Sequence, residues 1–204
     1  MSLSIEDFGG RVASVWSELR PTTRGLVERA LQKSSNTQAP TRSIPYDARA
    51  DLELSRLLTA LDDRASETDN SLETEKGDQL RYFADTCAAV LQEKTQSAEV
   101  FSQLVRRAEL QRDYARIDAL ADSLTRFSPS EICELARSTD VIIRALANEA
   151  LALFPTSLLV NLLSDPVDSE IAREALRRQA VEYDSEEARQ VVTALDQVDL
   201  DSEM

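Results

Sequence analysis

The sequence of 204 residues contains no histidine, and only four of its residues are glycine. Histidine is the commonest general base and the commonest metal ligand, so its absence excludes the site chemistries that depend on it. The last glycine is Gly77. Residues 78–204 therefore have no residue that easily adopts positive φ, which disfavours tight hairpins and phosphate-binding loops there. We expect no catalytic residues, no cofactor and no bound metal.

Basic residues are also few, because 37 acids face 23 bases and the formal net charge is -14. This balance repels nucleic acid, so we expect no nucleic-acid partner. An acidic surface favours solubility, and it can also attract a basic partner. Only three of the bases are lysine, and an acid-rich, lysine-poor composition is similar to that of proteins from a salt-rich, halophilic cytoplasm. A GC-rich genome would favour arginine as well, so the charge leaves these interpretations open.

Cysteine is scarce, and long hydrophobic runs are missing. Cys87 and Cys133 each lie on an apolar helix face, within "FADTCAAVL" and "EICELA", and we expect both to be small core residues. The opening "MSLSIEDFGG" lacks the apolar core of a signal peptide. No segment approaches the roughly 18 apolar residues of a membrane span. We expect a cytoplasmic protein with no membrane partner.

What the sequence does contain is helical periodicity, with apolar residues three or four positions apart through most of its length. It predicts an all-α fold. Pro21 separates two short amphipathic segments, and the following "SSNTQAPTRSIP" has the composition of a linker. The acidic "DQVDLDSEM" ends the chain. The predicted organisation is an N-terminal helical pair at 1–33, a linker at 34–46, a helical repeat domain at 47–197 and an acidic tail at 198–204.

Beyond residue 97 the predicted helices come in pairs, and the second helix of each pair carries an arginine in its first half and an aromatic residue at its end. Both residue types recur at intervals of 27 to 29 residues: Arg116, Arg144 and Arg173; Phe127, Phe154 and Tyr183. A shared period predicts repeated units, here at 97–127, 129–154 and 156–183, closed by a helix at 185–197. Short apolar first helices such as "SLLVNLLS" bury themselves only between neighbouring units.

The stretches "LLVNLLSDPVDSEIAREAL" and "ICELARSTDVIIRALANEAL" resemble units of the HEAT-like repeat family. Units of that family have a leucine-rich first helix, a turn with an aspartate, and a second helix with arginine and small residues. The resemblance implies a HEAT-like stack of antiparallel helix pairs, an α-solenoid. It also implies a polar ladder between turn acids and helix arginines, with these members: Asp113, Asp140 and Asp165 or Asp168; Arg116, Arg144 and Arg173.

The second helices also supply the candidate binding residues. Arg144 and Asn148 in one unit match Arg173 and Arg177 in the next at an offset of 29 residues, and each pair is spaced i, i+4. We expect these four side chains, joined by Arg178, to face the same way on adjacent helices and to bind another protein. Pairing of the arginines with nearby acids is the alternative.

The predicted function is a non-catalytic protein-binding module, which means an adaptor, scaffold or regulatory protein. Three alternatives stay open. The first is a HEAT-like DNA-binding or base-repair protein, which the net charge opposes. The second is a bilin lyase-like protein, for which no particular residue argues. The third is an acidic mimic of nucleic acid that occupies a basic protein. The partner's identity and the oligomeric state are not predicted.

Overall fold

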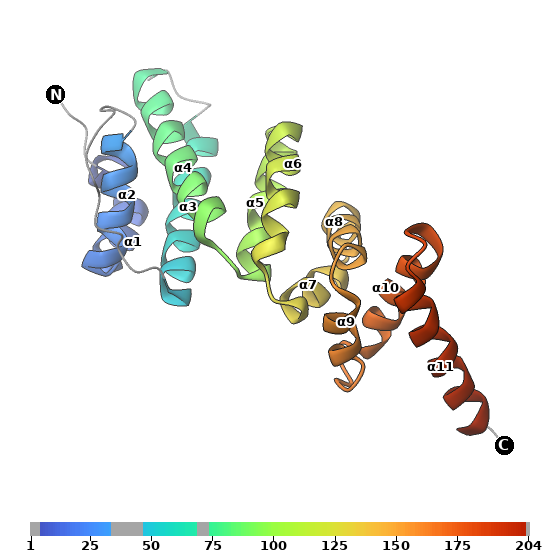
Figure 1. Ribbon diagram of the computed structural model, residues 1–204. Coiled ribbons are helices and arrows are strands. Elements are labelled where there is room, and N and C mark those ends of the chain that lie inside the picture. Colours follow the sequence, from blue (N-terminus) through green and yellow to red (C-terminus); the bar gives the residue numbers. More distant parts are fainter. Residues whose placement is uncertain (1–4, 34–46, 69–73, 203–204) are drawn as a thin grey trace. The chain divides into compact units, whose positions relative to one another are not determined.

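The computed structural model describes residues 5–33, 47–68 and 74–202, and all regular structure in these ranges is helical (Figure 1). The predicted all-α fold is confirmed, and the helices pack in neighbouring pairs. The predicted linker at 34–46 lies outside the described residues. The chain divides into two compact units, and the boundary lies between Leu104 and Val105.

The first unit is built on two long helices with the N-terminal helices packed against them. Its elements in chain order are η1 (Ile5–Phe8), α1 (Gly10–Glu18), α2 (Pro21–Lys33), α3 (Ala48–Thr68), α4 (Thr74–Lys94) and the first half of α5 (Ala98–Leu110). Helices α3 and α4 lie side by side (Figure 1), α1 packs against α3, and α2 packs against α4.

The N-terminal helices belong to this unit because their apolar face is buried in it. The buried side chains recur three or four positions apart on the apolar face of the first amphipathic segment: Ile5, Phe8, Val12, Trp16 and Leu19. The Phe8 ring meets the edge of Phe83 on α4, with 5.4 Å between ring centroids. Arg20, at the α1–α2 junction, forms 2.7 Å ion pairs with Asp47 and Glu53 at the start of α3. The N-terminal helices thus pack against α3 and α4 within the first unit, which ends at Leu104.

Acid-rich sequence is helical at two places in the chain. Helix α3 continues through Asp62 and Asp63 to Thr68, and α4 already begins at Thr74. Helix α11 (Glu186–Ser202) includes residues 198–202 of the predicted acidic tail. Glutamate loses little on entering a helix and aspartate loses more, but α11 contains no proline or glycine that would end it.

The second unit consists of shorter helices. After the second half of α5 it contains α6 (Tyr114–Ser123), η2 (Leu124–Arg126), α7 (Pro129–Ala136), α8 (Val141–Ala152), α9 (Thr156–Leu162), α10 (Ser169–Glu182) and α11. Helix α7 packs against α8, α9 against α10, and α10 against α11. Contacts also join α7 to α9 and α8 to α10.

Local sequence explains where these helices begin. Ser128 accepts a hydrogen bond from the Glu131 amide at the start of α7, where Pro129 occupies the first turn. Asp140 accepts from the amides of Ile142 and Ile143 at the start of α8. Each cap satisfies amides that the helix itself leaves without a partner.

Helices α7 and α9 have eight and seven residues. Isolated helices shorter than about 12 residues are marginal in water, so tertiary packing has to hold these two. Ile132 and Leu135 of α7 and Leu159 of α9 are almost completely buried. Leu151 of α8 and Leu176 of α10 are buried to the same degree.

A buried glutamine joins three helices at the centre of the second unit. Gln179 of α10 is 5% exposed, and its oxygen accepts a 3.0 Å hydrogen bond from the hydroxyl of Thr156 on α9. Its amide nitrogen donates to the backbone carbonyls of Ala152 and Phe154 at the end of α8. These carbonyls lack partners within their own helix, so the Gln179 amide satisfies them in an interior where water cannot.

Replacing Gln179 with methionine keeps the side-chain volume and removes all three hydrogen bonds. We expect Gln179→Met to lower the free energy of unfolding by about 2–3 kcal/mol, because buried polar groups are left unsatisfied. The matched change Gln190→Met, at an exposed position of α11, should alter it by less than about 0.5 kcal/mol. Urea unfolding followed by circular dichroism measures both, and equal effects would contradict the assigned role of Gln179.

Candidate functional site

An open groove of about 470 Å³ lies between α8 and α10 and also touches the last residue of α7. Its least exposed lining residues are apolar: Ala136, Ala175 and the half-buried Ile171. The rest of the lining is polar or charged: Asn148, Glu170, Glu174, Arg178 and Glu182. The groove thus combines a small apolar floor with a charged rim, and we call it the α8–α10 groove.

One line of α10 supplies the charged rim. Glu170, Glu174, Arg178 and Glu182 stand at every fourth position, which places them in one row that winds slowly around α10 over about 18 Å. Across the groove, α8 contributes Asn148. The sequence alone predicts this row, because side chains at i and i+4 are neighbours on the surface of a helix.

Arg178 is held in place by two carboxylates. Its guanidinium lies 2.7 Å from Glu149 of α8 and 2.7 Å from Glu182 of α10, so it connects the two helices. The hydroxyl of Tyr183 also donates a hydrogen bond to Glu149. This bond, together with Arg178, lowers the pKa of Glu149, and the same bond raises the pKa of Tyr183. The pKa of Arg178 is raised, chiefly by Glu182 and then by Glu149. The lowered pKa keeps the Glu149 carboxylate ionised at neutral pH, so that it forms an ion pair with Arg178.

The structure places the five predicted binding residues in different surroundings. Asn148 and Arg178 both line the groove. Arg177 is exposed and lies 3.9 Å from Glu174. Arg144 is partly buried and donates a 2.8 Å hydrogen bond to the Ser138 carbonyl in the turn before α8. Arg173 is partly buried and is not free, because it already contacts another group.

The glutamates of the groove were not among the predicted site residues. They match no known catalytic or metal-binding motif, and exposed acids on a helix are common at any protein surface. The available signal was the i, i+4 series from Glu170 to Glu182 on a helix whose other face is apolar.

Arginine–aspartate pairs do connect neighbouring helix pairs, but two of the arginines differ from those that the family resemblance implies. Asp140 pairs with Arg106 of α5 at 3.5 Å, while Arg144 caps its own turn. Asp168 pairs at 2.6 Å with Arg137, which follows α7. In both cases an arginine at or after the end of a first helix reaches the turn of the next pair.

The expected pair of Asp113 and Arg116 is present at 3.7 Å, inside one helix start. This pair does not connect two helix pairs, because Asp113 is the N-cap of α6, the helix that carries Arg116.

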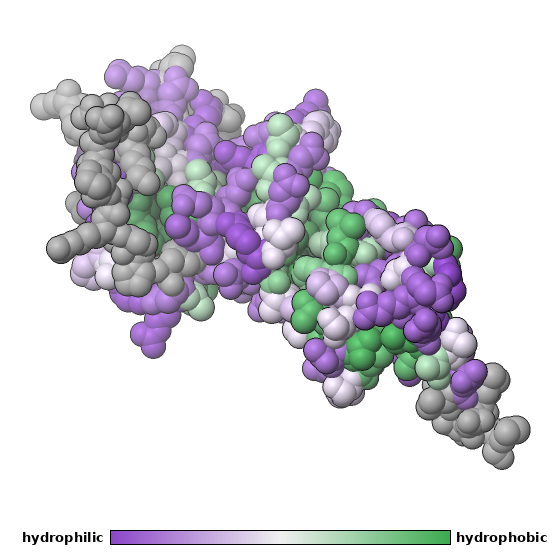
Figure 2. Space-filling view, in the orientation of Figure 1, coloured by the Kyte–Doolittle hydropathy of each residue, from purple (hydrophilic) through white to green (hydrophobic). Residues whose placement is uncertain are grey.

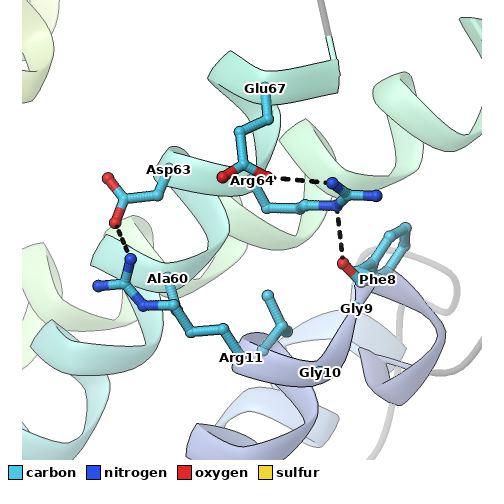
Figure 3. Close-up of a pocket in the computed structure, with 9 residues that line it drawn as sticks. Phe8, Gly9, Gly10, Arg11, Ala60, Asp63, Arg64 and Glu67 are labelled. Carbon is cyan, nitrogen blue, oxygen red and sulfur yellow. Dashed lines mark hydrogen bonds and ion pairs between the residues drawn. The ribbon is translucent and has the colours of Figure 1, made fainter. Parts of the chain in front are cut away.

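A second, smaller pocket of about 220 Å³ lies in the first unit, where the start of α1 meets α3 (Figure 3). Arg11 pairs with Asp63 at 2.7 Å. Arg64 donates a 3.0 Å hydrogen bond to the Phe8 carbonyl and pairs with Glu67 at 3.0 Å. The dashed lines in Figure 3 mark ion pairs and a hydrogen bond among the residues that line this pocket. These contacts hold the N-terminal segment against α3.

The two cysteines are buried, as predicted. The thiol of Cys87 donates to the Leu54 carbonyl at 3.4 Å. Burial, with Asp168 nearby, raises the pKa of the Cys133 thiol to about 12, so little thiolate forms at neutral pH. Within residues 5–33, 47–68 and 74–202, no three acidic or cysteine side chains gather in a way that could hold a metal ion.

No single helix in the described part of the chain has both the length and the apolarity to cross a membrane, and α8 and α9, which are bent by 116° at the break between them, reach these limits only when taken together. No protein-family model matches the chain, and neither the curated proteins nor the solved structures give a significant match.

The Arg137–Asp168 pair fixes one end of the α8–α10 groove, because Arg137 follows Ala136 and Asp168 precedes Glu170 by two residues. The Asp168 side chain is only 5% exposed. Arg137→Met would leave this carboxylate buried without its partner, and we expect a loss of about 2 kcal/mol in unfolding free energy.

Arg106→Met is the matched control, since its pair with Asp140 is longer and more exposed. It should cost less than about 1 kcal/mol. Thermal and urea unfolding compare the two variants. A cost for Arg106→Met as large as that for Arg137→Met would show that burial of Asp168 does not decide the effect.

Proposed function

We propose that this chain is a non-catalytic protein-binding module in which helix pairs stack as in HEAT-like repeat proteins and offer the α8–α10 groove to another protein. The observation that carries the proposal is the groove itself, with an apolar floor, a charged rim on α10 and Asn148 facing it from α8. Protein interfaces commonly combine an apolar centre with a polar surround.

Two features support the stacked arrangement. The first is that α7 contacts α9 and α8 contacts α10, so like elements of successive pairs touch. The second is the repeated connection from a first helix to the turn of the next pair, made by Arg106 with Asp140 and by Arg137 with Asp168. Stacking of this kind produces extended surfaces formed by several repeats, and such surfaces suit the binding of other macromolecules.

The rim charges argue for protein as the bound macromolecule. Three glutamates and one arginine line the groove, and the arginine is already paired with Glu149 and Glu182. Phosphate backbones are repelled by such a surface, which disfavours the DNA-binding and base-repair alternative. Asn148 and Arg178, both members of the predicted set, are the residues on which the proposal centres.

The test is quantitative co-purification from the source cells with the tagged full chain. We expect one stoichiometric protein partner with the wild type, and recovery at least about tenfold lower with Asn148→Trp, because the indole fills the groove. Asn161→Trp, at an exposed position of α9 outside the groove lining, is the matched control and should retain the partner.

Purification of the wild type without any partner across several salt concentrations would refute the proposal. Equal recovery with Asn148→Trp and Asn161→Trp would refute the assignment of the groove. Circular dichroism of both variants checks that each tryptophan leaves the helical fold intact.

A further inference from the structure

Exposed negative charge dominates the rim of the α8–α10 groove. Arg178 cannot offset it, because its guanidinium is shared between Glu149 and Glu182, each 2.7 Å away. Glu170 and Glu174 are exposed, and the side chain of Glu174 is 74% accessible with Arg177 as far as 3.9 Å away. A contact this long and this open to water contributes little. The rim therefore offers two carboxylates to a partner.

The position of these carboxylates limits what can complement them. Glu170 and Glu174 are four residues apart on α10, so their backbone positions are separated by about 6 Å along the helix axis. Two cations on one face of a partner helix have the same separation when they are four residues apart. The row of charged residues continues along α10 past Arg178 to Glu182, turning by about 40° around the helix axis at each step, and all four residues line the groove.

The floor of the groove sets a second requirement. Ala136 and Ala175 are nearly buried and small, and Ile171 is half-buried between the two rim glutamates in sequence. Small floor residues leave room for an incoming side chain, and an aliphatic one would remove the exposed part of Ile171 from water. Asn148, across the groove, can both donate and accept hydrogen bonds to a polar group at the edge of such a segment.

We infer that the occupant of the α8–α10 groove is a basic amphipathic helix of a partner protein, with lysine or arginine residues three or four positions apart beside an aliphatic residue. The inference rests on the proposed function and specifies its partner. A second copy of this chain is a poor occupant, because two chains of net charge -14 repel each other.

Hydrophobic side chains that reach the surface of the second unit do not define an alternative site. Figure 2 shows green residues over the region of α8 and α9. Exposed members include Val141, Leu153, Leu158 and Val160. Nothing in the structure indicates what would cover them, whereas the charges of the groove indicate what would occupy it.

A display library of random 16-residue peptides tests the inference. Selection uses the immobilised full chain, with Asn148→Trp as the counter-selection target. The expected consensus contains at least two lysine or arginine residues three or four positions apart beside leucine, isoleucine, valine or methionine. A consensus that is uncharged or acidic, or the enrichment of no sequence, would overturn the inference.

Charge-reversal variants then locate the binding of a labelled consensus peptide. Glu170→Lys combined with Glu174→Lys should raise Kd at least about tenfold, and added salt should weaken wild-type binding. The control is Asp118→Lys combined with Asp122→Lys, which has the same net charge and the same i, i+4 spacing on exposed positions of α6. It should stay within about twofold of the wild type.

Equal weakening by both double variants would show attraction to the overall charge of the protein, and it would overturn the inference. The proposed function is judged separately. The inference fails, and protein binding at the groove stands, in either of two cases. In the first, selection yields uncharged peptides whose binding is abolished by Asn148→Trp. In the second, co-purification yields a partner that depends on the groove but has no basic helix. If co-purification yields no partner, the proposed function fails too.

Discussion

The second unit depends on one constraint, which is that its first helices are too short to be stable without neighbours. Helices α7 and α9 have eight and seven residues, and such helices remain folded only when their apolar side chains are buried by other elements. Gln179 supplies the polar complement of this packing, because it satisfies the carbonyls that α8 leaves free where the chain turns toward α9. A helix pair of this kind is therefore specified jointly with the pairs beside it.

The α8–α10 groove is a consequence of the same packing. Helix α10 turns Leu176 and Gln179 inward, so its i, i+4 series of charged residues faces outward and along the groove. Arg178 then joins α10 to α8 through Glu149. Ion pairs of Arg178 and buried alanines hold the groove in shape, and a preformed site of this kind would lose less entropy on binding a partner.

The sequence predicts the local features of this structure well, because they depend on near neighbours. Apolar periodicity gives the all-α fold and the buried face from Ile5 to Leu19, and it places both cysteines in the core. The features that were missed depend on distances in three dimensions. Arg137 lies 31 residues before Asp168, and a period of 28 or 29 residues pointed to other arginines. The ends of α3 and α11 do not follow from composition, because acid-rich segments can be helical or irregular.

The most direct test of the groove as the binding surface is photo-cross-linking in the source cells. An aliphatic diazirine amino acid at Ile171 places the reactive group in the groove with little change of shape, and the same residue at the exposed Val160 of α9 is the control. The account predicts one discrete adduct with a single protein from position 171 and none from position 160. The same adducts from both positions, or an adduct from position 160 alone, would contradict it.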